Sequence, residues 1–162
     1  MQEDKNRPMK KVSDSYTEQV QMITQQDLNG YGRLFGGRLM EWIDEVAGIV
    51  ARRHSNSIVT TAMVDTLNFR GPAYPNDTIV LVGKVTYVGR TSMEVCVRAY
   101  KEDINGMKRT INKAYLVLVA LDENEKPKEV PGLIIENEIE QMEWDAAVKR
   151  NELRKSRRKQ HY

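Results

Sequence analysis

The sequence predicts an α+β domain in which one long helix packs against a single antiparallel sheet. An apolar stripe with helical spacing runs from about Gly37 to His54. One segment before this stripe and four after it have the composition of strands, and the last four are joined by short turns. Because short turns join antiparallel neighbours, these strands should form one sheet, with the helix as its second layer.

Length and composition support a single domain and argue against a nucleic-acid or membrane partner. The chain has 162 residues, which fits one domain, and its 25 basic and 23 acidic residues give a net charge of only +2. This balance argues against a nucleic-acid partner. The single cysteine, Cys96, excludes an intramolecular disulfide. No stretch has the length of a membrane span, so we expect a cytoplasmic protein with no membrane partner.

The first elements lead to the start of the long helix. Residues 1–14 are polar and mixed in charge, and we expect them to form a disordered leader without a secretory signal. Residues 16–24 are predicted to form the first strand. Asn29-Gly30 marks a loop, and Gly36-Gly37 permits close backbone approach where the helix begins.

The long helix carries an acidic residue that belongs to neither of its faces. Its apolar stripe is formed by Leu39, Ile43, Val46 and Val50. At about 100° per residue, Asp44 lies between the apolar and the charged sides, near Gly48 and Ala51. These two small neighbours leave room for a ligand or another chain to approach the carboxylate.

Strand signals dominate after the helix. The expected strands are residues 59–69, 78–88, 92–101 and 113–121. In the first of them, Val59, Met63, Leu67 and Phe69 are expected on one face. In the third, Glu94, Cys96, Arg98 and Tyr100 should lie opposite the apolar face, and Asn105-Gly106 predicts a hairpin turn. Residues 113–121 are apolar on both faces, which is typical of a central strand.

The last part of the chain predicts a second helix and a basic tail. Pro127 and Pro131-Gly132 close a domain of residues 15–131, which leaves residues 132–162 for these two features. A second, shorter amphipathic helix is predicted from a set of spaced apolar residues, Ile135, Ile139, Met142 and Ala146. The basic tail from Lys149 onward is interpreted as a solvated surface, with an anion-docking patch as the alternative. One helix cannot cover both faces of the sheet, so we expect oligomerisation.

Six short motifs, in order, resemble those of a known family. They are Asp27-Leu28-Asn29-Gly30-Tyr31-Gly32, Phe35-Gly36-Gly37, Trp42-Ile43-Asp44, Phe69-Arg70-Gly71-Pro72, Val88-Gly89-Arg90-Thr91-Ser92 and Val119-Ala120-Leu121-Asp122. Together they resemble the hotdog-fold acyl-CoA thioesterases over roughly residues 15–131. The resemblance implies a helix wrapped by a curved five-stranded sheet, and dimers joined edge to edge that often form trimers of dimers.

The resemblance also implies which residues act. Active sites lie at the dimer interface, where Asp44 of one chain faces Asn29 of the other. Asp44 would act as general base for water or attack the thioester directly, and both routes stay open. Backbone N–H groups at Gly36 and Gly37 would stabilise the oxyanion, because a helix N-terminus carries partial positive charge. No cofactor or metal is implied.

Coenzyme A, as part of the substrate and as a product, needs cations for its phosphates. By resemblance, Arg90 with Thr91 and Ser92 is the first candidate, and Arg70 is the second.

Three other functions compete with hydrolysis. The main alternative is a non-catalytic acyl-CoA-binding regulatory module, although such a module does not need both Asp44 and Asn29. A dehydratase would need a histidine beside a carboxylate, but His54 ends the helix and His161 lies in the tail. The positive charge of the tail is the only sequence feature that favours an RNA-associated function.

Overall fold

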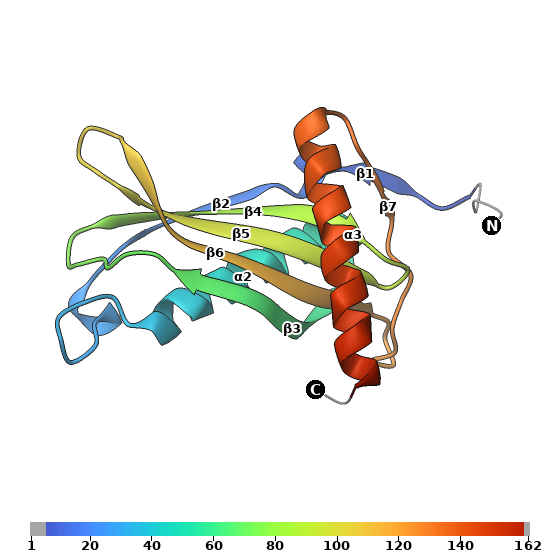
Figure 1. Cartoon of the computed structure of the whole chain (residues 1–162), viewed down its shortest axis with the longest axis horizontal. Helices are drawn as coiled ribbons and strands as arrows, with labels where there is room; N and C mark the ends of the chain where they lie inside the picture. The colour runs from blue at the N-terminus through green and yellow to red at the C-terminus, as the bar shows by residue number, and fades with distance from the viewer. Residues whose placement is uncertain (1–5, 161–162) are drawn as a thin grey trace.

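The computed structural model describes residues 6–160, and the chain folds into a curved sheet with helices on both of its faces (Figure 1). Its elements are β1 (Met9–Lys11), α1 (Val12–Ser15), β2 (Thr17–Met22), η1 (Gln25–Asp27), α2 (Gly36–Ser55), β3 (Ile58–Phe69), β4 (Thr78–Val88), β5 (Ser92–Glu102), β6 (Lys108–Leu121), β7 (Gly132–Ile134) and α3 (Glu138–Lys159). None of the helices described is long and apolar enough to cross a membrane.

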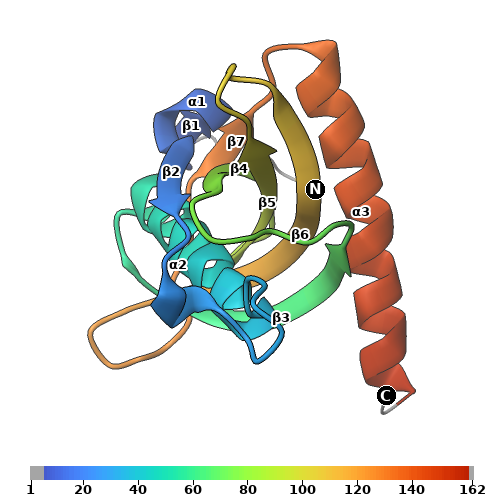
Figure 2. The same cartoon turned by 90° about the vertical axis from the view of Figure 1, so that its left-hand side faces the viewer.

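The main sheet confirms the predicted layer architecture. Its five strands are antiparallel, in the order β2-β4-β5-β6-β3, so β2 and β3 form the two edges. The sheet curls around α2, while α3 lies across the opposite, outer face (Figure 2). The expected hairpin at Asn105-Gly106 is present, with Gly106 at φ +82°.

The long helix α2 packs into the sheet along the predicted stripe. Leu39, Ile43, Val46 and Val50 are all buried in the core. The helix approaches the sheet most closely at Gly83 of β4, where a methyl group would lie 2.7 Å from Cγ1 of Val46. Asn56 ends the helix in the left-handed conformation at φ 50°, as a C-terminal cap.

Residues 9–14 form β1 and most of α1, so the prediction that they belong to a disordered leader is wrong. Strand β1 pairs in parallel with β7, and Arg7 donates to the carbonyl oxygens of Val130 at 2.8 Å and Gly89 at 2.6 Å. These partners are distant in sequence, so local composition could not reveal them. Residues 1–5 of the expected leader lie outside the described residues. The first main-sheet strand is Thr17–Met22, shorter than expected.

Strand β3 departs from regular alternation. Its register with β6 shifts between Thr61 and Met63, and again between Val64 and Thr66. Each shift is a β-bulge that adds one residue, Ala62 or Asp65. The expectation that Met63 shares the face of Leu67 is therefore wrong, because Met63 pairs with Val117 on the outer side.

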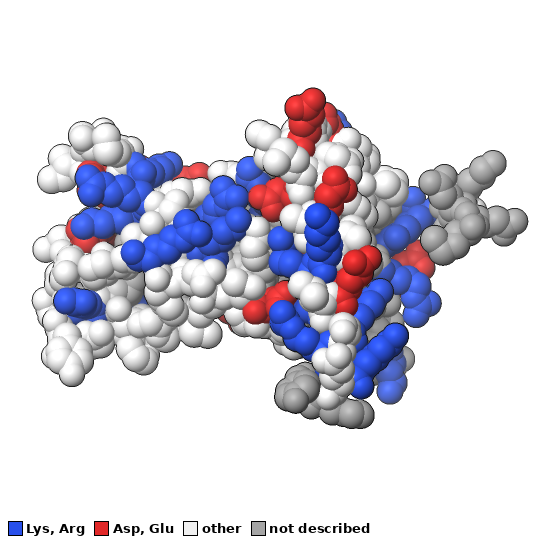
Figure 3. All heavy atoms as spheres, in the orientation of Figure 1, with Lys and Arg blue, Asp and Glu red and all other residues white. Residues whose placement is uncertain are grey.

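Helix α3 docks through ion pairs and through apolar residues that differ in part from those predicted, since Ala147 is fully buried and Trp144 packs against the core. Ile139 and Met142 are 73% and 71% exposed, so their predicted docking role is wrong. Arg154 is only 4% exposed and pairs with Asp65 of β3 at 2.9 Å and with Glu94 of β5 at 2.8 Å. Figure 3 shows basic and acidic side chains interleaved along this helix. The basic segment from Lys149 is thus largely helical, with some of its arginines bound to the sheet; His161 lies outside the described residues.

Candidate active site

Asp44 projects from α2 toward the edge strand β3. Its Oδ1 accepts a hydrogen bond from the Thr61 hydroxyl at 2.6 Å, while the side chain stays open to solvent. Thr61 lies on the helix-facing side of β3, in register with Leu118 of the core, because the two bulges together add two residues and keep it in phase with Leu67. The carboxylate is therefore accessible and oriented, as a base or a nucleophile must be.

Two open grooves meet at Asp44 and Thr61. The first extends toward the start of α2 and is mainly apolar, lined in part by Met40, Val64 and Leu67. The second extends toward the end of α2 and is lined in part by Gly48 and Arg52 of the helix and by Val59 and Thr60 of β3. Asp44 thus lies between a mainly apolar groove and a second groove that is lined in part by Arg52.

Asn29 lies in the loop before α2, with its side chain held in one orientation. Its Oδ1 accepts the backbone N–H of Tyr31 at 2.9 Å and of Arg33 at 3.2 Å. With the oxygen occupied in this way, the amide NH₂ is left to donate outward. The loop is fixed to the helix start, because Phe35 N–H donates to the carbonyl of Asp27 at 2.8 Å.

Gly36 and Gly37 form the first residues of α2, where backbone N–H groups lack partners within the helix. A methyl group on Gly37 would lie 2.6 Å from the Phe35 ring, so the turn is tight. Asp44 is seven residues beyond Gly37, or about 10 Å along the helix axis. Gly37 nevertheless lines the same apolar groove as Asp44 and Thr61.

The two arginine candidates lie at opposite ends of the sheet. Arg90, Thr91 and Ser92 form the β4–β5 turn, and Ser92 is level with Thr60 through Val119. The Arg90 turn is therefore two strands, or about 10 Å, from the start of β3. Arg70 follows the last residue of β3, roughly 30 Å from that level. One chain cannot bring Arg70 and Arg90 to the same phosphate.

Two residues of the site were missed in the sequence analysis. Thr61 was missed because its hydrogen bond to Asp44 joins two different elements, which the strand pattern alone does not show. Arg52 was not named as a candidate, but it lines the same groove as Asp44 and Gly48. Its spacing of eight residues from Asp44, about two helical turns, was the available signal.

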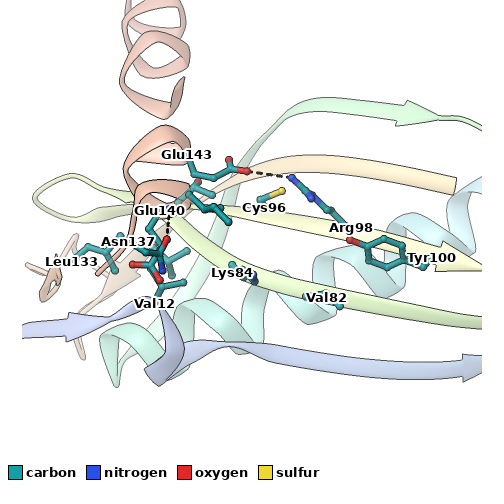
Figure 4. A pocket seen from close by; sticks show the side chains of 13 residues that line it. Val12, Val82, Lys84, Cys96, Arg98, Tyr100, Leu133, Asn137, Glu140 and Glu143 are labelled. Atoms are coloured by element: carbon teal, nitrogen blue, oxygen red, sulfur yellow. Dashed lines mark hydrogen bonds and ion pairs between the residues drawn. The ribbon is translucent and has the colours of Figure 1, made fainter. Parts of the chain in front are cut away.

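A separate cavity of about 220 Å³ lies on the outer face, between the sheet and the start of α3 (Figure 4). Cys96 and Arg98 of β5 line it, and Arg98 pairs with Glu143 of α3 at 3.2 Å. Burial raises the pKa of the Cys96 thiol, which disfavours the nucleophilic thiolate. Because the sheet separates this cavity from Asp44, it is not part of the candidate site. In residues 6–160, no group of His, Cys, Asp or Glu is placed to hold a metal ion.

A long helix wrapped by an antiparallel sheet, with a helix carboxylate facing an edge strand, defines a hotdog-fold protein of the thioesterase type. A family model described as the thioesterase superfamily matches residues 31–108. An uncharacterized acyl-CoA thioester hydrolase of Bacillus subtilis, YkhA, is 40% identical over 134 residues, which cover 82% of this chain and 78% of that protein. The chain belongs to the acyl-CoA thioester hydrolases of this superfamily.

Solved structures agree with this assignment. An acyl-CoA hydrolase of Staphylococcus aureus in complex with coenzyme A has a TM-score of 0.92 and 38% identity, covering 96% of this chain and 94% of that one. Structures of this enzyme include alanine variants of an asparagine, an aspartate and a threonine. An apo-hexameric acyl-CoA thioesterase has a TM-score of 0.89 and 38% identity, covering 93% and 97%. Mouse cytosolic acyl coenzyme A thioester hydrolase is longer, and this chain, at 32% identity, spans 40% of it.

Proposed function

We propose that this chain hydrolyses acyl-CoA thioesters to a carboxylic acid and coenzyme A, at a site built by two copies. The observation that carries the proposal is the oriented, accessible Asp44 carboxylate at the junction of an apolar and a cation-lined groove. The names of the relatives and the coenzyme A complex of the Staphylococcus hydrolase support the substrate class. The residue types replaced in that enzyme are those of Asn29, Asp44 and Thr61.

In the proposed reaction, Asp44 removes a proton from a water molecule that attacks the thioester carbonyl carbon. The alternative is direct attack by the carboxylate, which gives a mixed anhydride that water then hydrolyses. In both routes the C–S bond breaks, and coenzyme A leaves as a thiolate that takes up a proton. The Thr61 hydroxyl holds the carboxylate in place.

Asn29, Gly36 and Gly37 would act on the substrate held by Asp44 of the partner chain. The Asn29 NH₂ group would donate to the water or the thioester, and the glycine N–H groups would donate to the oxyanion. Edge strand β3 is open for pairing with a second copy, and a hexameric relative supports dimers assembled as trimers.

The coenzyme A moiety would occupy the groove on the Arg52 side of Asp44. Arg90, with the hydroxyls of Thr91 and Ser92, is the proposed phosphate contact near that end of the sheet. Arg70 can reach the same phosphates only from another chain, given its distance from Arg90. The apolar groove past Met40 and Leu67 would then receive the acyl chain.

The direct test is thiol release from acyl-CoA esters of increasing chain length. Asp44→Asn should lower kcat by roughly 10²–10⁴-fold, the range for a lost general base. Glu45→Gln is the matched control, because it makes the same chemical change one residue away on the rim of the same groove. Near-native turnover in Asp44→Asn would reject the catalytic role. Tight acyl-CoA binding without thiol release by the wild-type chain would instead identify a regulatory module.

The shared site is tested by mixing inactive chains. In a dimer of one Asp44→Asn chain and one Asn29→Ala chain, one site carries both defects and the other carries neither. Verified mixed dimers should therefore recover about half of the wild-type activity, because a two-fold dimer has two equivalent sites. Mixed dimers as inactive as their parents would place the whole site within one chain.

A further inference from the structure

The second bulge of β3 is held by helix α3. Asp65 is the extra residue of this bulge, because Val64 and Thr66 pair with the consecutive residues Leu116 and Tyr115. Its side chain is only 5% exposed and accepts from Arg154 at 2.9 Å. Arg157, which is half-exposed, adds a weaker contact at 3.2 Å. The bulged carboxylate is therefore bound from the outer face of the sheet.

Arg154 is itself fixed, so it can act as an anchor. Its guanidinium also pairs with Glu94 of β5 at 2.8 Å, and the Glu94 side chain is completely buried. Arg150 and Thr86 bind the same carboxylate at 2.8 Å and 2.6 Å. Buried ions with several partners are held rigidly, because moving one partner leaves an uncompensated charge. The anchor thus connects the bulge of edge strand β3 to the interior strand β5.

The position of this bulge decides which way Thr61 points. Beyond the bulge, Leu67 packs against the core in register with Ala114. Removing one extra residue from a strand turns every residue before it to the opposite face. If the Asp65 bulge were lost while the Ala62 bulge stayed, Thr61 would therefore point to the outer side, away from Asp44.

We propose that Arg154 is a positioning residue that fixes the Asp65 bulge and so aims Thr61 at Asp44. This inference rests on the proposed hydrolase function for its effect on turnover, but not for its effect on strand β3. Bulges beside active sites commonly reorient one side chain, which is the role assigned here. The basic C-terminal segment thereby contributes to the reaction from the far side of the sheet.

The test compares two ion pairs that both join α3 to the sheet. Asp65→Ala removes the bulge contact but leaves Arg154 paired with Glu94, so the chain should still fold. Glu143→Ala is the matched control, because it removes the pair with Arg98 of β5 and touches no residue of β3. The measurements are kcat and KM for acyl-CoA, and amide hydrogen exchange across residues 58–69.

Asp65→Ala should lower kcat by about 10-fold or more while KM changes by less than about 2-fold, since the affected group acts in the transition state. Exchange across residues 58–69 should accelerate. Glu143→Ala should leave kcat and this exchange near the wild-type values, and Arg154→Lys should fall between wild type and Asp65→Ala.

Equal loss of kcat in Asp65→Ala and Glu143→Ala would overturn the proposal, since α3 docking alone would then explain both. Unchanged exchange across residues 58–69 in Asp65→Ala would overturn it as well. A wild-type chain that releases no thiol would reject the proposed hydrolase function, while the exchange comparison would still decide whether Asp65 holds β3.

Discussion

Gly83 sets the distance between helix α2 and the sheet, and replacing it with alanine should destabilise the protein. The added methyl would lie 2.7 Å from Val46 Cγ1 and 2.8 Å from Val50 Cγ2. Carbon atoms normally approach to about 3.5–4.0 Å, so the overlap is about 1 Å. Valine has one strongly preferred rotamer in a helix, and the two side chains cannot simply rotate away. The helix must move instead.

Overpacking of this kind costs about 1–3 kcal/mol of unfolding free energy. At roughly 2–4 °C per kcal/mol for a chain of this size, Gly83→Ala should melt about 2–12 °C below wild type at equal protein concentration. Asp44 lies two residues before Val46, so the shift also displaces its carboxylate relative to Thr61. A displacement of about 1 Å can lower turnover by up to about 10²-fold.

Calorimetry and thiol release measure these two effects. Gly48→Ala is the control for stability, because a methyl there meets no atom within 4 Å. It should stabilise α2 by up to about 1 kcal/mol through helix propensity alone. If Gly83→Ala melts at the wild-type temperature, the close approach of α2 to β4 is not a constraint on this fold.

Three further changes have defined outcomes. Arg90→Ala should raise KM for acyl-CoA more than it lowers kcat, and should spare a short thioester that lacks the nucleotide; equal damage with both substrates would indicate a structural role. Burial lowers the pKa of His54, whose Nε2–H donates to the Pro131 carbonyl at 2.8 Å, from its usual 6.5. The unfolded chain therefore binds more protons, and denaturant titrations should show stability falling as pH drops below about 6.5, less so in His54→Gln. Neither amide atom of the buried Asn112 has a hydrogen-bond partner among residues 6–160, so Asn112→Leu should stabilise the fold by about 1–3 kcal/mol in urea unfolding; a loss of stability would indicate a bound partner for the amide.

The sequence predicted those parts of the fold that depend on local patterns. Helix α2 was predicted within about a residue at each end, because its apolar stripe is regular and buried on one side. The alternation in β5 also held, with Met93 and Val95 in the core and Arg98 on the outer side. Asp44 and Asn29 were selected by resemblance to family motifs, and their catalytic roles remain predictions.

The parts that failed depend on contacts between distant segments. Thr61 was missed because a single threonine in a strand gives no signal of its contact with Asp44, which lies 17 residues away on another element. The ion pairs of α3 were missed because an arginine-rich segment is expected to be solvated unless its acidic partners are known. Asp65 and Glu94 lie 89 and 60 residues before Arg154.

The charged network beneath α3 has a consequence for how this protein can diverge. The core under α2 tolerates exchange of one aliphatic side chain for another of similar volume. Asp65, Glu94, Arg150 and Arg154 have less freedom, since changing one removes a partner from another charge of the same network. Descendants of this sequence should therefore keep these four residues or replace them together. Helix α3 has the charged composition of a variable surface element, yet it should be among the slowest parts of the chain to change.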